Sequence, residues 1–234
     1  MSKLAVLNDL FTRYQQLNYH QNPQLLQRLR DVQQWQKQRI QRTHAQRFNE
    51  KQNILMAEYF MNRLYGGPDF DALAQQIERL LPKINKAEKL IPENAVKTGT
   101  AGIQLAILAV QLDEQIAAQL LADYPADLPL SDEIMRLTYL KLDQGQARLE
   151  QLRQLDLLGQ SLDKYLRSFV VHTAFKMCKS VAYKHRFDVM YDFMQDGFVA
   201  MKPLKSAEKF VNDFTAQERG IVAKVHAGDL HPFA

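Results

Sequence analysis

Hydrophobic residues recur at intervals of three and four positions along most of the chain. A first stretch shows this spacing over Leu4 to Leu17, and a second begins after Asn22-Pro23 and continues to Trp35. The spacing places apolar side chains on one face of an α-helix, whereas the strict alternation typical of a half-buried β-strand is not evident. Asn22 is a candidate helix cap, with Pro23 in the first turn. The pattern predicts an all-α protein.

Glycine, proline and polar residues mark the ends of the predicted helices. Gly66-Gly67-Pro68-Asp69 is the clearest boundary, because the glycines and proline stop one helix and the aspartate can cap the next. A break is expected near 49–53, and the residues from 228 to 234 are expected to form a flexible tail. No internal repeat or low-complexity linker is evident. We therefore predict a single domain, residues 1–234, built as a bundle of about seven or eight helices.

The most apolar segment lies in a long predicted helix over residues 93–121. Its apolar run, Ala101 to Val110, is half the length that a bilayer-spanning helix needs, and Gln104 interrupts it. We expect a buried core helix and no membrane partner. The first apolar run also ends too early, at Asn8-Asp9, for the core of a signal peptide.

Composition and cysteine content narrow the class further. Apolar residues make up 46% of the 234 residues and charged residues 24%, as in ordinary globular proteins. The single cysteine, Cys178, excludes an intramolecular disulfide and a multi-thiolate zinc site. A reducing compartment fits this content, so a cytoplasmic location is expected. Packing as a small buried hydrophobe is the favoured role of Cys178, with a reactive thiol as the alternative.

The charges are unevenly distributed along the chain. The formal net charge of +4 is too small by itself to indicate a nucleic-acid or membrane partner. However, residues 113–133 contain six acids and no Lys or Arg, whereas residues 28–51 contain seven basic residues and two acids. A second basic cluster comprises Lys176, Lys179, Lys184 and Arg186.

The basic segment 28–51 is a candidate partner-binding face. Its members are Arg28, Lys37, Arg39, Arg42, Arg47 and Lys51. A solvated helix face is the simpler interpretation. The alternatives are an acidic surface of another protein or another copy, and a phosphate backbone followed by the Arg and Lys side chains.

No catalytic constellation is found. No Glu-x-x-His pair, no two histidines four apart, no Gly-rich phosphate loop and no Gly-x-Ser-x-Gly elbow occurs in the sequence. We therefore assign no catalytic residue, metal site or cofactor. One candidate ligand pocket remains, in which His172 would be a haem ligand or a core histidine, and core packing is favoured. Its members are His172, Met190, Met194 and Phe198.

One segment resembles the signature of a known family. Residues 59–66 read Tyr-Phe-Met-Asn-Arg-Leu-Tyr-Gly and are followed by Pro68-Asp69-Phe70. This resembles a bacterial family of uncharacterised proteins named for a Phe-Phe-Leu-Glu-Glu-Leu-Tyr motif. Arg42-Thr43-His44-Ala45, Asp192-Phe193 and Gly197-Phe198 are similar to further family stretches, so the likeness spans roughly residues 25–225. The residues assigned to the motif region are Tyr59, Phe60, Leu64, Tyr65, Gly66, Pro68, Asp69 and Phe70.

The chain departs from that motif at the paired glutamates, where Asn62 and Arg63 stand, and Tyr59 and Met61 keep only the apolar character. The resemblance implies a bacterial, cytoplasmic, helical protein with no assigned reaction. With the charge distribution, it leads to the hypothesis of a non-enzymatic binding or scaffold protein that recognises a protein partner or itself. A small-molecule or haem carrier is one alternative, and nucleic-acid binding through residues 28–51 is another and less favoured one.

Overall fold

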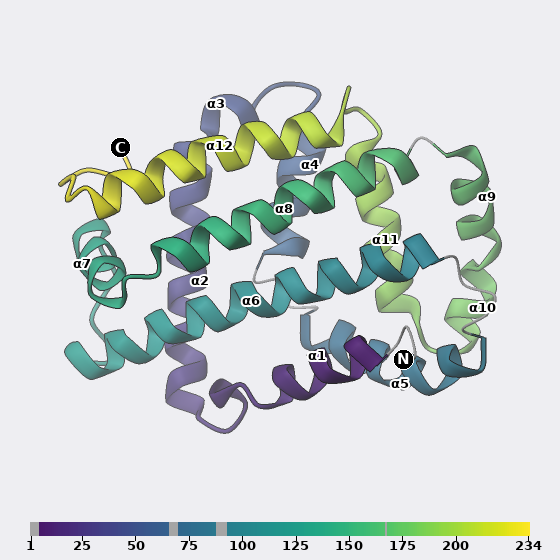
Figure 1. Ribbon diagram of the computed structural model, residues 1–234, viewed down its shortest axis with the longest axis horizontal. Helices are drawn as coiled ribbons and strands as arrows, with labels where there is room; N and C mark the ends of the chain where they lie inside the picture. The colour runs from purple at the N-terminus through teal and green to yellow at the C-terminus, as the bar shows by residue number, and fades with distance from the viewer. Residues whose placement is uncertain (1–4, 66–69, 88–92, 167) are drawn as a thin grey trace.

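The computed structural model describes residues 5–65, 70–87, 93–166 and 168–234 (Figure 1). Within these ranges the chain is helical and contains no β-strand, so the predicted all-α class is confirmed. The helices are α1 (Ala5–Gln15), α2 (Pro23–Thr43), α3 (Ala45–Phe48), α4 (Ile54–Tyr59), α5 (Phe70–Ala87), α6 (Glu93–Asp123), α7 (Asp132–Leu142), α8 (Gly145–Leu166), α9 (Phe169–Met177), α10 (Lys179–Lys184), α11 (Asp188–Met201) and α12 (Ala207–His226). These twelve segments exceed the predicted seven or eight because short turns divide several of the periodic stretches. One such division, between α3 and α4, falls at the predicted break.

Polar side chains cap several of these helices. The Asn22 side chain accepts a hydrogen bond from the Leu25 amide at 3.1 Å, and Pro23 occupies the first turn of α2. Ser131 accepts from the Ile134 amide at the start of α7, and Ser206 does the same for Lys209 in α12. Each cap satisfies an amide that has no partner within its helix, which fixes where the helix begins.

The long helices lie side by side, as Figure 1 shows. α12 lies along α8, α8 lies along α6, and α6 packs against α2, which crosses behind them in this view. α7 lies at one end of these helices and α9 and α10 lie at the other, where α10 contacts α11. α1 and α5 pack against each other on the side remote from α12.

Two clusters of apolar side chains form the core. The larger one includes Val32, Ile116 and Leu120, each with no solvent exposure, and lies between α1, α2, α6 and α7. The smaller one contains Phe48, Phe210 and other residues from α2, α3, α4, α11 and α12. α2 contributes to both clusters. Burial of each large apolar side chain contributes about 1.5–3 kcal/mol, so α2 is central to stability.

α6 is the predicted core helix. By length and composition alone, its residues 97–123 could cross a membrane. In the structure the helix lies between α2 and α8, and its side chains Ile107, Leu112 and Ile116 are buried against other helices. Burial on several sides is typical of the central helix of a large helical core.

The C-terminal residues, expected to be flexible, are held against the bundle instead. The Phe233 ring is buried with its centroid 5.1 Å from that of Trp35, in an edge-to-face arrangement. Phe233 also contacts the ring of Tyr139, and Pro232 is fully buried. The sequence pattern after Gly228 is not helical, but the buried side chains of Pro232 and Phe233 anchor the segment.

Candidate interaction surfaces and the buried charge network

The six candidate basic residues do not form one surface. Arg28 and Arg39 are only 3% and 5% exposed, which removes them from any face that a partner could reach. Lys37 and Arg47 are half-buried, and Arg42 and Lys51 are exposed. Spacing explains the result, because Arg28 and Arg39 fall on the apolar stripe of α2 at helical intervals from Val32 and Trp35.

Arg28 and Arg39 use their charges inside the molecule. Nη1 of Arg28 donates to the Leu128 carbonyl at 2.9 Å. Nη1 of Arg39 lies 2.5 Å from Oε1 of Glu218, and its Nη2 donates to Oε1 of Gln36 at 2.9 Å. A buried guanidinium needs such partners, because leaving it unpaired in the interior is strongly unfavourable.

Glu218 also accepts a hydrogen bond from Nε2 of His44 at 2.7 Å. The carboxylate is an acceptor only, so the His44 proton must be on Nε2. Burial raises the pKa of Glu218, but the Arg39 charge and the hydrogen bonds from His44 and Arg39 outweigh burial and lower the pKa to about 2. Glu218 therefore stays ionised in the interior.

A second buried pair extends this arrangement. Nη2 of Arg148 donates to Oδ1 of Asp113 at 2.9 Å, and the Tyr65 hydroxyl donates to Oδ2 at 2.6 Å. The Arg148 guanidinium lies over the ring of Tyr139, and the Tyr139 hydroxyl accepts from Gln36. Burial, with the Asp113 charge, holds the pKa of Tyr65 well above its usual range.

These contacts form a buried charge network that joins α12, α2, α7, α8 and α6. Its charged members are Arg39, Glu218, Arg148 and Asp113, two of each sign. Because their side chains are at most 11% exposed, the network can fix the register of the helices but offers no reactive group to a ligand in solution.

Five of the six acids of the stretch 113–133 have partners within the same chain. Asp113 belongs to the buried charge network, and Glu114 accepts from the amides of Asn18 and Tyr19. The remaining ion pairs are Asp123 with Lys141, Asp132 with Arg42, and Glu133 with Arg136. Many of the opposite charges thus meet inside one molecule, which leaves less exposed charge for the predicted contact between a basic helix and the acidic surface of another copy.

The candidate ligand pocket is filled by side chains. The His172 ring packs against the Phe198 ring with 4.8 Å between centroids, and the Phe175 ring lies 4.9 Å from the centroid of Phe198. Met194 is 45% exposed rather than facing a cavity, and the Met190 amide donates to Gln76. These contacts fit packing rather than a haem or ligand site. Among the described residues, no group of His, Cys, Asp and Glu is arranged to hold a metal ion.

The motif residues connect helices. Tyr59 donates to the Phe193 carbonyl at 3.0 Å, and a Cβ at Gly197 would lie only 3.0 Å from its hydroxyl. Thus the motif meets both downstream stretches that resemble the family. Phe60 begins a π-helical turn, Phe60–Leu64, and packs against Phe214. The Tyr65 hydroxyl donates to Asp113. Leu64 is 40% exposed, and Phe70 is half-buried. The remaining motif residues, Gly66, Pro68 and Asp69, lie outside the described residues.

A hollow between α1 and α5 is lined by aromatic and acidic residues. The Tyr14 hydroxyl donates to Asp71, and Tyr19 donates to Tyr14 at 3.3 Å. Burial is the main cause that raises the pKa of Tyr14, and it raises the pKa of Tyr19 to about 12. Both phenols therefore remain protonated donors and are poor nucleophiles at neutral pH.

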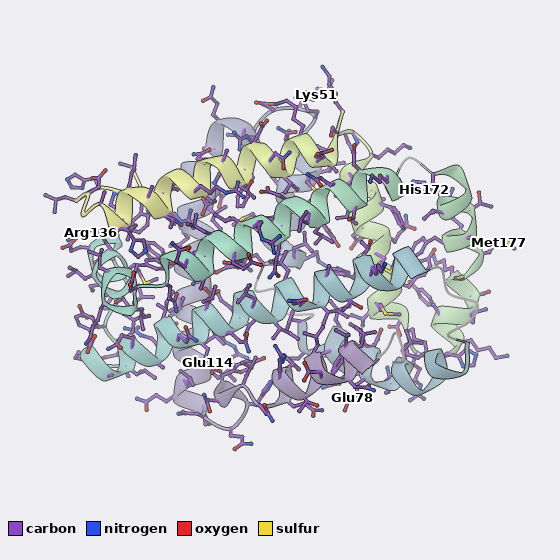
Figure 2. The ribbon with its side chains drawn as sticks, in the orientation of Figure 1. Lys51, Glu78, Glu114, Arg136, His172 and Met177 are labelled. Atoms are coloured by element: carbon purple, nitrogen blue, oxygen red, sulfur yellow. The ribbon has the colours of Figure 1, made fainter. Side chains whose placement is uncertain are left out.

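The second basic cluster is exposed and lies apart from α2. Lys176, Lys179, Lys184 and Arg186 are all exposed, on or next to α9 and α10. Figure 1 shows these helices at the far end of the molecule from α7, whereas α2 crosses the bundle nearer to α7, so the second basic cluster does not adjoin the basic residues of α2. Met177, labelled in Figure 2 at the same edge, is 76% exposed and Val181 is 57% exposed. Cys178 is exposed as well, so the expected burial of this residue is wrong.

Comparison with family models gives one match. The model described as "Domain of unknown function (DUF8198)" matches residues 16–232. The chain belongs to this family. Neither a comparison with curated proteins nor one with solved structures found a match.

The DUF8198 match includes every charged member of the buried charge network. It also includes α9 and α10, and the anchored segment as far as Pro232. The interior contacts and the exposed basic end described above therefore belong to the family domain and not to an appended segment.

Proposed function

We propose that this DUF8198 protein is a non-enzymatic binding protein of the bacterial cytoplasm. In this proposal it recognises an acidic, amphipathic segment of another protein through the exposed outer side of α9 and α10, the α9–α10 face. This face comprises Lys176, Met177, Lys179, Val181, Lys184 and Arg186. The observation that carries the proposal is the exposure of Met177 and Val181 among basic residues.

Uncompensated charge supports an acidic partner. Residues 164–187 contain no Asp or Glu. Among the described residues, none of the four basic side chains of the α9–α10 face forms an ion pair, although Lys179 lies over the ring of Tyr183. Positive charge left unpaired attracts and orients an anionic partner, and removing such charges slows association.

The inner side of the same helices is fixed by aromatic packing. Phe175 stacks on Tyr191 with 4.3 Å between centroids and 5° between ring planes. Tyr183 packs edge-on against Tyr191 and donates to Asp192 at 2.6 Å. These contacts hold α9 and α10 against α11, so the backbone that carries the outer side chains is ordered before binding, which lowers the entropic cost of recognition.

The mixture of side chains favours a protein over the other anionic surfaces. Methionine and tyrosine are enriched at protein interfaces, and methionine adapts to irregular apolar surfaces. A nucleic acid would use the lysines but would leave Met177 and Val181 without apolar contacts. α9 and α10 contain 9 and 6 residues, so neither presents the long apolar face of an interfacial membrane helix.

A short synthetic helical peptide, with glutamates on one face and leucines on the other, provides a defined probe. Its binding is measured by fluorescence anisotropy at about 0.1 M salt, where exposed charges still act over roughly 10 Å. We expect K176Q/K179Q/K184Q and, separately, M177Q/V181Q each to weaken binding by roughly tenfold, since each removes about 1.4 kcal/mol or more of contact energy.

The matched control is K51Q/K202Q/K205Q, which removes three exposed lysines outside the face and should stay within about twofold of the unmodified protein. If this control weakens peptide binding as much as K176Q/K179Q/K184Q does, the loss of affinity reflects net charge alone and the proposal is overturned. If duplex DNA or anionic vesicles bind more tightly than the peptide, and through the same lysines, the partner is a nucleic acid or a membrane and the proposed protein partner is wrong.

A further inference from the structure

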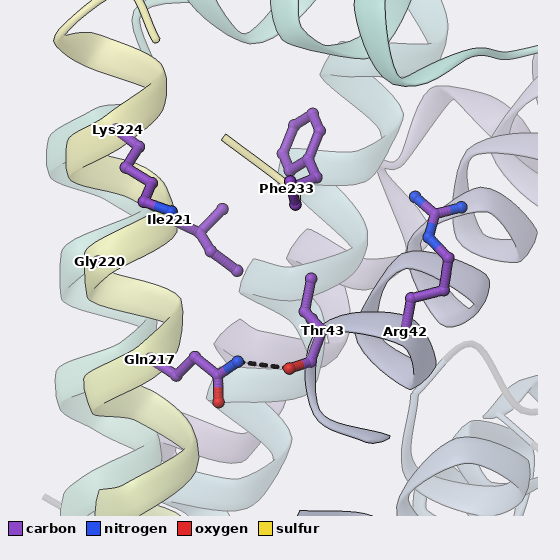
Figure 3. A pocket seen from close by; sticks show the side chains of 8 residues that line it. Arg42, Thr43, Gln217, Gly220, Ile221, Lys224 and Phe233 are labelled. Atoms are coloured by element: carbon purple, nitrogen blue, oxygen red, sulfur yellow. Dashed lines mark hydrogen bonds between the residues drawn. The ribbon is translucent and has the colours of Figure 1, made fainter. Parts of the chain in front are cut away.

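A groove of about 580 Å³ lies between the end of α2 and the second half of α12 (Figure 3). Ile221 and Phe233 give it apolar walls, and Thr43 and Gln217 line it where the Gln217 amide donates to the Thr43 carbonyl. Sites for small molecules have volumes of about 300–1,000 Å³ and combine apolar walls with a few polar groups. The groove has both properties.

Two cations flank the apolar part of the groove. Figure 3 shows Arg42 and Lys224 on opposite sides of Ile221 and Phe233. Nη2 of Arg42 makes both contacts to Asp132, at 2.8 Å each, so the ion pair uses only one nitrogen of the guanidinium. Both cations lie near helix C-termini, where they also offset the helix dipoles. Because the two charges also have this structural role, they do not by themselves indicate a ligand site. The apolar hollow that lies between them does.

Gly220 leaves the groove open on the α12 side. A Cβ placed on this residue would meet no atom within 4 Å, although the residue lines the groove. Glycine within a helix is less stabilising than alanine. The bare backbone at this position thus keeps space that almost any side chain would occupy.

We infer that this groove binds a small amphipathic organic carboxylate. The apolar body of the ligand covers Ile221 and Phe233, while the carboxylate pairs with Lys224 at one edge of the apolar hollow. The α9–α10 face contributes no residue to this site, so the inference is independent of the proposed partner.

Paired fluorescent probes test the site. Anilinonaphthalene sulfonate is an amphipathic anion whose emission rises in apolar surroundings, and N-phenylnaphthylamine is its neutral counterpart. We expect the anion to bind with one-to-one stoichiometry, decanoate to displace it, and the neutral probe to bind roughly tenfold more weakly because it lacks the charge-assisted contact. K224Q should weaken binding of the anion several-fold.

Filling the groove gives the sharpest comparison. G220L places a side chain in the open space, and G99L makes the same change at another helical glycine whose Cβ would also meet nothing within 4 Å. G220L should abolish one-to-one binding, while G99L and M177Q/V181Q should bind as the unmodified protein does. Thermal unfolding verifies that all variants fold.

Three results would overturn the inference: no saturable binding of the anion, equal affinity for the neutral probe, or unchanged affinity in G220L. Because the acidic peptide is tested separately, failure here leaves the proposal for the α9–α10 face intact, and the reverse also holds.

Discussion

Arg39 and Glu218 form an ion pair inside the helical bundle, with 2.5 Å between Nη1 and Oε1. The two residues are 179 positions apart in the sequence, and their side chains are 7% and 11% exposed. The pair joins α2 to α12, and His44 donates to the same carboxylate oxygen. Because both charges are buried, each depends on the other for compensation.

Removing one member of this pair should be severely destabilising. R39M leaves the Glu218 carboxylate buried beside His44 alone, and we expect the free energy of unfolding to fall by about 3–5 kcal/mol. Urea denaturation followed by circular dichroism measures the change. The double variant R39M/E218M should recover most of the loss, because no uncompensated charge remains. A double variant as unstable as R39M would mean that packing, not the unpaired charge, dominates.

Stability should depend on acid through Glu218. Its pKa is lowered from 4.5 to about 2 in the folded protein, so the unfolded state binds the proton more readily. The stabilisation, of the order of 3 kcal/mol, is present above about pH 4.5 and is lost as the pH falls toward 2. E218Q should remove this part of the pH dependence of unfolding.

Glu150 supplies the control for this titration. Hydrogen bonds from Arg153 and Gln154 also lower its pKa, but its pair with Arg153 lies at the surface, where solvent reduces the shift. Solvent screens such pairs, so E150Q should leave the acid dependence of unfolding nearly unchanged. If E150Q and E218Q flattened the profile equally, burial of Glu218 would not be the cause.

Gly197 should not tolerate a side chain. A Cβ there would lie 3.0 Å from the Tyr59 hydroxyl and 3.1 Å from its Cζ, so the ring would have to leave its hydrogen bond to the Phe193 carbonyl. We expect G197A to destabilise by about 1–3 kcal/mol despite the better helix propensity of alanine. G220A, in open space, should stabilise by about 0.5–1 kcal/mol. Thermal unfolding of both variants gives the comparison, and effects of the same sign would refute it.

The fluorescence of Trp35 can report whether the C-terminal segment is anchored to the bundle. Trp35 is the single tryptophan, and the buried ring of Phe233 packs against it. F233A should destabilise by about 3 kcal/mol or more and, in the folded state, shift Trp35 emission to longer wavelength as water reaches the indole. L230A, at a residue that is 67% exposed in the same segment, should change neither quantity. An unshifted spectrum for F233A would show that the segment does not cover Trp35.

Local spacing was sufficient to predict the helical class and several helix boundaries. Asn22 begins α2 where the sequence indicates a cap, and the α3–α4 boundary falls within the predicted break. Caps and apolar periodicity act over a few residues, so they can be read without knowledge of the fold.

The role of individual charged residues could not be predicted in the same way. Arg28 and Arg39 look like members of a basic surface when charges are counted, yet they lie on the apolar stripe of α2. Their position on this stripe could have indicated from the sequence that both side chains are buried. Their partners, the Leu128 carbonyl and Glu218, come from distant segments that no local pattern identifies.

The sequence by itself determined that this chain forms amphipathic helices and that it lacks the familiar catalytic motifs. Only the tertiary structure decided which charges are neutralised inside the molecule and which stay exposed at its surface. Most acids of the acidic stretch, and Arg28, Arg39 and Arg42 of α2, have partners within the chain, whereas the lysines of α9 and α10 form no ion pair with any described residue. The physical reason is that helix formation depends on neighbours along the chain, while burial and ion pairing depend on residues brought together from distant positions.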